Sequence, residues 1–571
     1  MAANVKNKGP GEAGKLVIVL VVALLLRIIL ALFETEVGVD SVHYILMGDN
    51  IAHGRGFETW NTTGGTWILP PTFPLLIAIF RLLGFSLEWS GHIASIVAGT
   101  ALLVPLYYLT KRLFNQTTAN IAILIGSFTP ILVDYSVVIL TELLFVTFVL
   151  SMMLFVIRAY SGKGTVLDSF LSGLFSALAF LTKTFGIFLL PFLLLGYLFS
   201  RGGKSKVPGI KHALMALIAF LILAVPYWVM LHSATGDWTI DGKGTGQESR
   251  IHARNLTEEH IDPRYAGILT DDGSDFAINQ DQYPFEKLTG IEFAVNYVKK
   301  YAQKLVRIYQ DFPFTPTYPN NVLLLYLFPA MLLGIGLFSG PGRWKDRDSD
   351  RFLLYWICPF VFGIPLIFVE VRYFIPLIPL LIPFMARGIE EIAALLVVRF
   401  PKFFARYSRP AFRPAIVIVV AVFILLAVPK LTWKITKWSD PMVSYNPRKI
   451  AASWLMSHDY SPGRIMEYGH SVSFYCGAQS ILVPDADLES VISIARKYDI
   501  EILSLDEFYV LRANRRPEIE FLFDTESPPP VELERIYVDE RFNGLKHVIY
   551  RIRTPDEIAS GEISEIWSMM N

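Results

Sequence analysis

Charged residues are scarce in this sequence. Only 18% of its 571 residues are charged and 53% are hydrophobic, whereas a soluble globular protein normally has about 25% charged residues. This composition excludes an ordinary cytosolic enzyme and a disordered chain. Lys and Arg together number 51, as do Asp and Glu. The chain therefore has no excess of positive charge of the kind that would indicate binding to nucleic acid.

Cysteine is rarer still, and the motifs of nucleotide-binding enzymes are missing. The two cysteines, Cys358 and Cys476, are far apart, one in an apolar block and one in a polar tail, so they predict no disulfide framework. The sequence has neither a Walker A motif nor a G-x-G-x-x-G pattern after a strand. A nucleotide is therefore not indicated as a substrate or cofactor.

Long apolar blocks take the place of these features. Most are roughly 17–25 residues long, which is the length of a helix that crosses a bilayer. We therefore predict a mainly α, polytopic membrane protein with about 11 transmembrane helices. The block at 68–84 begins Leu69-Pro70-Pro71 and is interpreted as a helix at the membrane edge. The blocks cover residues 16–33, 68–84, 91–110, 119–133, 138–157, 168–182, 185–200, 208–231, 321–338, 352–370, 373–388 and 414–431.

The polar segments between these blocks predict the orientation of the chain, because short cytoplasmic segments collect Lys and Arg. With the N-terminus in the cytoplasm, the inside segments are all basic or rich in Lys and Arg. They are the N-terminal tail, 111–112, 158–163, 201–211, 343–351 and 399–413. The long polar segments at 34–70, 233–320 and 432–571 then lie outside the cytoplasm.

Two domains follow from this arrangement. Residues 1–431 form the predicted transmembrane domain, with external loops at 34–70 and 233–320. Residues 432–571 form a predicted soluble, extracytoplasmic α/β domain, because helix-like and strand-like stretches alternate there. The expected helices cover 447–457 and 488–497, and the expected strands lie at 464–468, 481–483, 500–505, around Tyr537, and at 547–552.

Four ionisable residues stand at the outer ends of predicted spans: Asp40, Glu142, Lys183 and Arg372. Charges at such positions are costly in lipid and tend to face a cavity. Arg and Lys suit a phosphate group, and a nearby carboxylate can act as a general base on a hydroxyl group. These side chains are therefore predicted to form a site that handles a lipid phosphate.

Each of the four residues also has a purely structural interpretation. Asp40 precedes a helix-like stretch and could cap its N-terminus. Glu142 could neutralise a neighbouring Arg or Lys. Lys183 and Arg372 could extend their charged ends towards the membrane surface.

Several short motifs in the apolar and loop segments resemble the GT-C class of membrane glycosyltransferases. The closest type is the protein-mannosyltransferase and lipid A aminoarabinose transferase family (ArnT-like), and the likeness covers roughly residues 16–400. The motifs are Asp40-Ser-Val-His-Tyr44, His53-Gly-Arg-Gly-Phe57, Leu69-Pro-Pro71, Thr141-Glu142-Leu-Leu, Leu181-Thr-Lys183 and Arg372-Tyr373-x-x-Pro376.

The resemblance implies a hexosyl or pentosyl transferase in a bacterial inner membrane. It would move a sugar from a polyprenyl-phosphate carrier to a hydroxyl group of lipid A, a glycan or a protein, on the non-cytoplasmic face and with inversion. The roles that it implies are catalytic for Asp40 and Glu142, binding of the carrier phosphate for Arg372 and Lys183, and lining of the site for Tyr44, Tyr373 and His43.

The sequence departs from the family pattern at two places. Ser41 replaces the second acid of the first loop, and Leu69 and Pro70 replace an acid–Lys pair. The second change removes one candidate metal ligand, so no cofactor is certain, and a divalent metal ion is left open.

Other functions fit the same pattern. A transporter or flippase of a lipid-linked sugar would also need basic residues around an anion, although it would place charges near the middle of the bilayer. A membrane-anchored binding or assembly protein would have residues 432–571 as its active part. An enzyme of the same class could instead move a whole oligosaccharide.

Overall fold

The structure is a computed structural model, and part of the chain is described in it. The described residues are 12–34, 37–57, 69–160, 164–199, 209–236, 238–240, 268–269, 276–277, 299, 302–303, 331–337, 347–367, 371–405, 412–432, 435, 446–483, 487–507, 510, 518–542 and 544–560, together with residue 517 as the first residue of a 3-10 helix.

The chain divides into two compact units. The helical unit contains Met1–Glu34, Pro70–Asp241 and Leu288–Thr436, and the sheet unit contains Thr35–Leu69, Gly242–Lys287 and Lys437–Asn571. The segment after the first apolar block, residues 35–69, therefore groups with the C-terminal residues and not with the helices that precede and follow it in the sequence.

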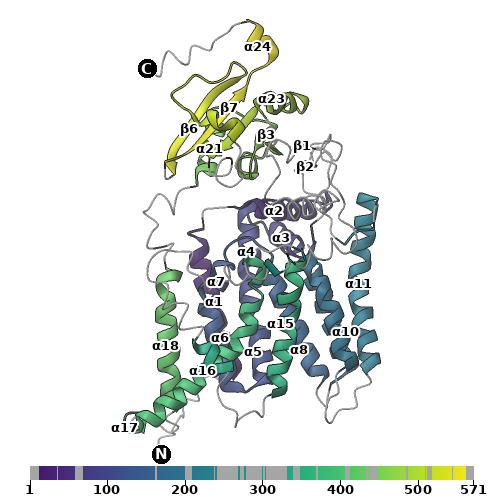
Figure 1. Ribbon diagram of the computed structural model, residues 1–571, viewed down its shortest axis with the longest axis vertical. Helices are drawn as coiled ribbons and strands as arrows, with labels where there is room; N and C mark the ends of the chain where they lie inside the picture. The colour runs from purple at the N-terminus through teal and green to yellow at the C-terminus, as the bar shows by residue number, and fades with distance from the viewer. Residues whose placement is uncertain are drawn as a thin grey trace, which may run out of the picture. The chain divides into compact units, whose positions relative to one another are not determined.

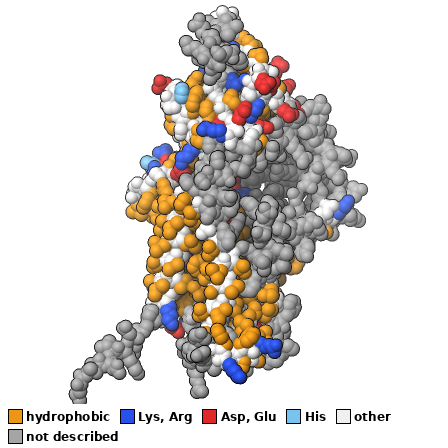
Figure 2. Space-filling model, turned by 90° about the vertical axis from the view of Figure 1, so that its left-hand side faces the viewer, with side chains coloured by type: hydrophobic (Ala, Val, Ile, Leu, Met, Phe, Trp, Pro, Cys, Tyr) orange, Lys and Arg blue, Asp and Glu red, His pale blue; other side chains and the backbone are white. Residues whose placement is uncertain are grey.

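The helical unit is a bundle whose helices run side by side (Figure 1). Large hydrophobic side chains point outward from it, among them Val17, Leu25, Ile222 and Leu425, and hydrophobic side chains predominate on the coloured part of the bundle's surface in Figure 2. Such a surface is suited to lipid. The elements are α1 (Glu12–Ala31), α3 (Thr72–Leu82), α4 (Leu87–Ala101), α5 (Leu103–Leu113), α6 (Gln116–Phe128), α7 (Pro130–Asp134), α8 (Glu142–Ala159), α9 (Val166–Phe180), η1 (Thr184–Phe188), α10 (Leu189–Phe199), α11 (Gly209–Thr235), α15 (Arg347–Ile367), η4 (Val371–Phe374), α16 (Leu377–Arg399), α17 (Pro401–Ala405) and α18 (Phe412–Leu431).

Four helical spans of the described residues are long and apolar enough to cross a membrane: Glu12–Ala31, Leu87–Leu113 (α4 and α5 together), Glu142–Ala159 and Gly209–Ala234. The predicted count of about 11 is therefore wrong for this part of the chain. Several apolar blocks form helices that are too short, because about 20 residues are needed. Helix α6 has 13 residues, α9 has 15 and α10 has 11.

Small residues let α9 and α11 approach closely. Ser169, Ser172 and Gly173 are on the buried side of α9, and a Cβ atom placed on Gly173 would collide with the backbone of Ala216 in α11. The hydroxyl group of Ser169 is also hydrogen-bonded to Nδ1 of His212 on α11. Close backbone contact and hydrogen bonds between helices are the main attractions available inside a membrane.

The sheet unit contains a mixed five-stranded sheet in the order β4-β3-β5-β7-β6. Strands β4, β3 and β5 are parallel, whereas β7 runs antiparallel to β5 and β6. The predicted alternation of strands and helices is thus confirmed. The elements are α2 (Val39–Ala52), β1 (Ile268–Leu269), β2 (Phe276–Ala277), α21 (Pro447–Ser457), β3 (Arg464–Glu467), α22 (Ser471–Cys476), β4 (Gln479–Leu482), α23 (Leu488–Lys497), β5 (Ile502–Asp506), η6 (Pro517–Phe523), β6 (Leu533–Phe542), β7 (Leu545–Ile552) and α24 (Pro555–Ser560).

Helices cover both faces of this sheet. Successive strand residues point to opposite faces, so Ile465 packs in one core with α21, whereas Met466 packs in the other core with α23. The same alternation separates Ile502 from Leu503 on β5. The result is a three-layer α/β/α domain.

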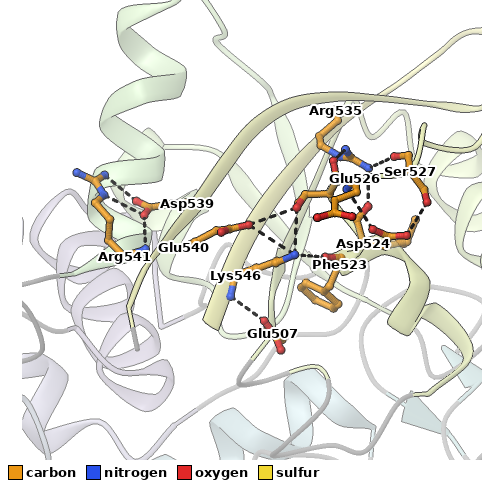
Figure 3. A network of polar contacts seen from close by, with 12 residues as sticks. Glu507, Phe523, Asp524, Glu526, Ser527, Arg535, Asp539, Glu540, Arg541 and Lys546 are labelled. Atoms are coloured by element: carbon orange, nitrogen blue, oxygen red, sulfur yellow. Dashed lines mark hydrogen bonds and ion pairs between the residues drawn. The ribbon is translucent and has the colours of Figure 1, made fainter. Parts of the chain in front are cut away.

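Polar contacts fix the turn before the β6–β7 hairpin (Figure 3). The guanidinium group of Arg535 donates hydrogen bonds to the backbone carbonyls of Asp524, Thr525 and Ser527, each at 2.8 Å. The Nζ atom of Lys546 donates to the carbonyl of Phe523 at 2.9 Å. Turn carbonyls that would otherwise need water are therefore bonded to the hairpin.

We predict that Gly173→Ala lowers the free energy of unfolding by about 1–3 kcal/mol, the usual cost of overpacking, because α9 and α11 must separate. Gly334→Ala is the matched control, since its Cβ atom would meet nothing within 4 Å. Denaturation of the purified protein in SDS would measure both. An equal, small effect in the two variants would contradict the close packing of α9 on α11.

His547 makes the stability of the sheet unit depend on pH. Burial lowers the pKa of His547 to about 4, whereas an exposed histidine has a pKa of about 6.5. Between these two pH values the unfolded chain binds a proton that the folded chain does not bind. Stability is therefore complete above pH of about 6.5 and is lost as the pH falls towards about 4, by about 3 kcal/mol in total.

Hydrogen exchange of β5 and β7 in the full-length protein, corrected for the intrinsic rate at each pH, would measure this loss. His547→Gln should flatten the dependence, because the amide can still bond to Ser504 Oγ, which lies 2.9 Å from Nε2 of His547, but does not titrate. His458→Asn, at an exposed position, is the control. An unchanged pH profile in His547→Gln would refute the assignment to His547.

Candidate active site

Glu142 is the first residue of α8 and is buried, with 3% of its side chain exposed. A carboxylate this deep among apolar helices is costly unless positive charge and hydrogen bonds compensate it. An acid in the first turn is also favoured by the helix dipole. Glu142 therefore needs cationic partners from neighbouring elements.

Two basic residues from other parts of the chain supply this charge. Lys183 stands in extended backbone between α9 and η1, and its Nζ atom lies 2.8 Å from Oε1 of Glu142. Arg372 comes from η4, and its Nε atom lies 4.0 Å from the same oxygen. The side chains of Lys183 and Arg372 are 18% and 25% exposed. Two positive charges thus face one negative charge in a partly shielded place.

The ring of Tyr373 packs against both cations. Nζ of Lys183 lies 4.1 Å from the ring centroid, and Cζ of Arg372 lies 5.6 Å from it. Cations are attracted to the faces of aromatic rings within about 6 Å. Tyr373 therefore helps to hold Lys183 and Arg372 beside each other.

The second carboxylate oxygen of Glu142, Oε2, is buried and has no hydrogen-bond partner among the described residues. A buried acceptor without a donor costs about 1–3 kcal/mol or more. A hydroxyl group of a ligand, or a water molecule, would satisfy it. The cluster of Glu142, Lys183, Arg372 and Tyr373 thus combines two cations with one buried acceptor that has no donor among the described residues.

Four of the residues predicted for the site are brought together in this way, and the structural alternatives can be judged for two of them. Glu142 does neutralise basic neighbours, as the alternative interpretation stated. Lys183 is not simply extended towards a membrane surface, because its ammonium group is bonded to a buried carboxylate.

Asp40, His43 and Tyr44 lie on α2 and belong to the sheet unit. The capping interpretation of Asp40 is wrong, because the N-cap position of α2 is Gly38 and no side chain accepts a hydrogen bond there. The helix begins one residue before Asp40, which places this carboxylate in the first turn. His43 is buried against His470, the N-cap residue of α22, with ring centroids 4.9 Å apart.

No motif in the sequence points to His470. It lies in the C-terminal domain, more than 400 residues from His43, and no local pattern links the two residues. The one sequence signal is the Gly469-His470 pair between a strand and a helix, where both residues have positive φ.

A metal ion does not fit the described residues. They contain no group of three or more His, Cys, Asp or Glu side chains able to hold one. The buried carboxylate of Glu142 already faces Lys183 and Arg372, whose charges would repel a divalent cation. No chemistry at this cluster is therefore derived from a metal.

Comparison with known proteins gives a consistent picture of the fold. Residues 69–229 match the model of the family described as dolichyl-phosphate-mannose-protein mannosyltransferase. No curated protein matches the sequence of the chain.

Solved structures match over nearly the whole chain. ArnT from Cupriavidus metallidurans in the apo state is 13% identical, with a TM-score of 0.60 over 94% of this chain and 98% of that chain. The same protein bound to undecaprenyl phosphate has a TM-score of 0.56 at 13% identity, over 95% and 99%. The archaeal oligosaccharyltransferase AglB from Archaeoglobus fulgidus, in complex with an inhibitory peptide and a dolichol-phosphate, is 15% identical, with a TM-score of 0.54 over 86% and 69%. The predicted resemblance to the GT-C class is confirmed, and at these identities the structural likeness concerns the fold.

We predict that Lys183→Met destabilises the protein by about 3–5 kcal/mol, because it leaves the buried carboxylate of Glu142 without its nearest cation. Adding Glu142→Gln should restore most of the stability, since the buried negative charge is then removed as well. Lys111→Met is the control: its ion pair with Glu12 is exposed and worth about 1 kcal/mol or less. Denaturation in SDS would give the three values, and equal losses for Lys183→Met and Lys111→Met would rule out the buried pair.

Proposed function

We propose that this chain, which resembles membrane glycosyltransferases of the GT-C class, transfers a sugar from a polyprenyl-phosphate carrier to an acceptor hydroxyl group. The observation that carries the proposal is the pair of cations, Lys183 and Arg372, gathered on one buried carboxylate in a chain with this fold. Lys and Arg side chains bind phosphate groups through charge-assisted hydrogen bonds, and here the two are held beside the same carboxylate.

Lys183 and Arg372 bind the carrier phosphate, which is the leaving group of the reaction. When the bond between the anomeric carbon and the phosphate oxygen breaks, its electron pair stays on the carrier phosphate. Two cations fixed by Glu142 and Tyr373 stabilise this developing charge without having to reorient. Glu142 then acts chiefly by holding the two cations, and its Oε2 atom is available to a sugar or acceptor hydroxyl group.

Asp40 acts as the general base for the acceptor hydroxyl group. The acceptor oxygen attacks the anomeric carbon from the face opposite the phosphate, which inverts the configuration, and its proton passes to the Asp40 carboxylate. A positioned general base contributes about 10²–10⁴-fold to the rate. Tyr44 and Tyr373 are proposed to line the site.

We place this reaction on the non-cytoplasmic face of a bacterial inner membrane, with the N-terminus in the cytoplasm. The support is the distribution of Lys and Arg among the short polar segments. The acceptor is a hydroxyl group of lipid A, a glycan or a protein, and the sugar is a hexose or a pentose.

To test the proposal, the purified protein is given radiolabelled polyprenyl-phosphate sugars and a membrane extract as acceptor, and the rate at which label passes to the extract is measured. Asp40→Asn should lower the rate by about 10²–10⁴-fold, because the amide cannot accept the proton. Asp348→Asn is the control, since the side chain of Asp348 is 97% exposed and should leave the rate unchanged. A near-normal transfer rate in Asp40→Asn would show that Asp40 is not the general base.

The same assay separates the main alternative. If no donor supports transfer, but binding of the polyprenyl phosphate depends on Arg372, the cation pair serves a transporter or flippase of a lipid-linked sugar. Movement of the labelled lipid across the bilayer of a proteoliposome would then be measured.

A further inference from the structure

Helix α2, which carries Asp40, is attached to the C-terminal α/β domain. Both belong to the sheet unit, and α2 contacts the short helix α22. Ser471 Oγ, at the start of α22, donates a hydrogen bond of 3.2 Å to the carbonyl of Val37, two residues before α2 begins. The rings of His43 on α2 and His470 meet edge to face, with their centroids 4.9 Å apart. The hydrogen bond to Val37 and the contact between the two rings together hold the first turns of α2.

The backbone at His470 is unusual and is held in place. His470 has φ 60° and ψ 11°, in the left-handed region, which residues other than Gly seldom occupy. Its Nδ1 atom lies 2.7 Å from Ser480 Oγ on β4. The turn therefore aims the imidazole ring at α2, and the neighbouring strand fixes its orientation.

Helix α22 is itself fixed to the sheet. Glu467, the last residue of β3, is buried, and its two carboxylate oxygens accept hydrogen bonds from the backbone N–H groups of Val472 (3.0 Å) and Ser473 (2.7 Å). These N–H groups belong to the first turn of α22, where helices leave donors unsatisfied. A chain of contacts thus leads from the sheet through α22 and His470 to α2.

The ring of His470 is neutral in its contact with His43. Burial lowers the pKa of His470 well below its usual range, and the nearby His43 lowers it further, whereas the carboxylate of Asp40 opposes this effect. Asp40 is therefore close enough to His470 for its charge to be felt there. Both histidines are only 5% exposed, so their contact is shielded from water.

We propose that His470 is a positioning residue that acts through His43 to hold α2, and hence Asp40, in the orientation that transfer requires. This inference rests on the proposed function, in which Asp40 accepts the proton of the acceptor hydroxyl group. It also assigns a role to the C-terminal domain, which holds the carboxylate of Asp40 in position for the acceptor hydroxyl group.

The first experiment uses His470→Asn in the full-length protein. Asparagine tolerates the left-handed conformation, so the turn is kept while the ring contact with His43 is lost. We expect kcat to fall about tenfold and KM for the polyprenyl-phosphate sugar to stay within about twofold, because the carrier phosphate is bound elsewhere. Hydrogen exchange of the α2 amides, residues 39–52, should accelerate at least tenfold.

The control is His458→Asn, at an exposed histidine on the same domain, which stacks on Trp454 and not on α2. It should change neither kcat nor exchange in α2. A His470→Asn variant with wild-type exchange in α2, or one in which KM rises while kcat is unchanged, would overturn the proposal.

A double-mutant cycle tests whether His470 acts through His43. If it does, His470→Asn should lower kcat about tenfold in the wild type but by less than about twofold in the His43→Ala background. Multiplying effects would show that the two residues act independently and would contradict the proposal.

The two proposals fail in different ways. Asp40→Asn with normal transfer, or no transfer by the wild type, removes the proposed function. Hydrogen exchange of α2 in His470→Asn still reports on the attachment in either case, because it needs no substrate. Unchanged exchange alongside a functional Asp40 would remove the positioning role alone.

Discussion

A carboxylate buried among apolar helices must be matched by positive charge, and in this protein that requirement joins three segments of the helical unit. Glu142 stands at the start of α8, Lys183 in the turn after α9, and Arg372 in η4. The ion pair at 2.8 Å and the second cation at 4.0 Å draw these segments to one point. The buried acid and its two cations thereby lie at the proposed position of the carrier phosphate.

In the sheet unit, two of the buried polar side chains are satisfied by uncharged hydrogen-bonding groups instead of by opposite charges. Glu467 is satisfied by backbone N–H donors of α22 rather than by a salt bridge, and His470 is oriented by Ser480. Hydrogen bonds of this kind specify direction more closely than charge attraction does, because they weaken steeply with angle. A helix that must present one side chain at a fixed angle is better attached by such contacts.

The sequence was most informative where a residue was chemically out of place. Glu142, Lys183 and Arg372 stood out as charges at the ends of apolar blocks, and the structure gathers them. The strands and helices of the C-terminal domain were visible because alternation and amphipathic spacing are local properties. The number of spans was overestimated because hydropathy does not reveal where a helix ends: α6 stops after 13 residues, next to Pro130, within a longer apolar block. His470 could not be found, because its partner is distant in sequence and its conformation depends on the folded turn.

The grouping of residues 35–69 with the C-terminal domain bears on how this architecture can be altered. The sheet unit is discontinuous in the chain, since α2 is separated from α22 by nearly the whole helical unit. A hybrid made by exchanging the C-terminal segment alone would combine a foreign α22 with the original α2. Recombination between related chains would therefore have to exchange both segments at once, and the two should diversify as a pair.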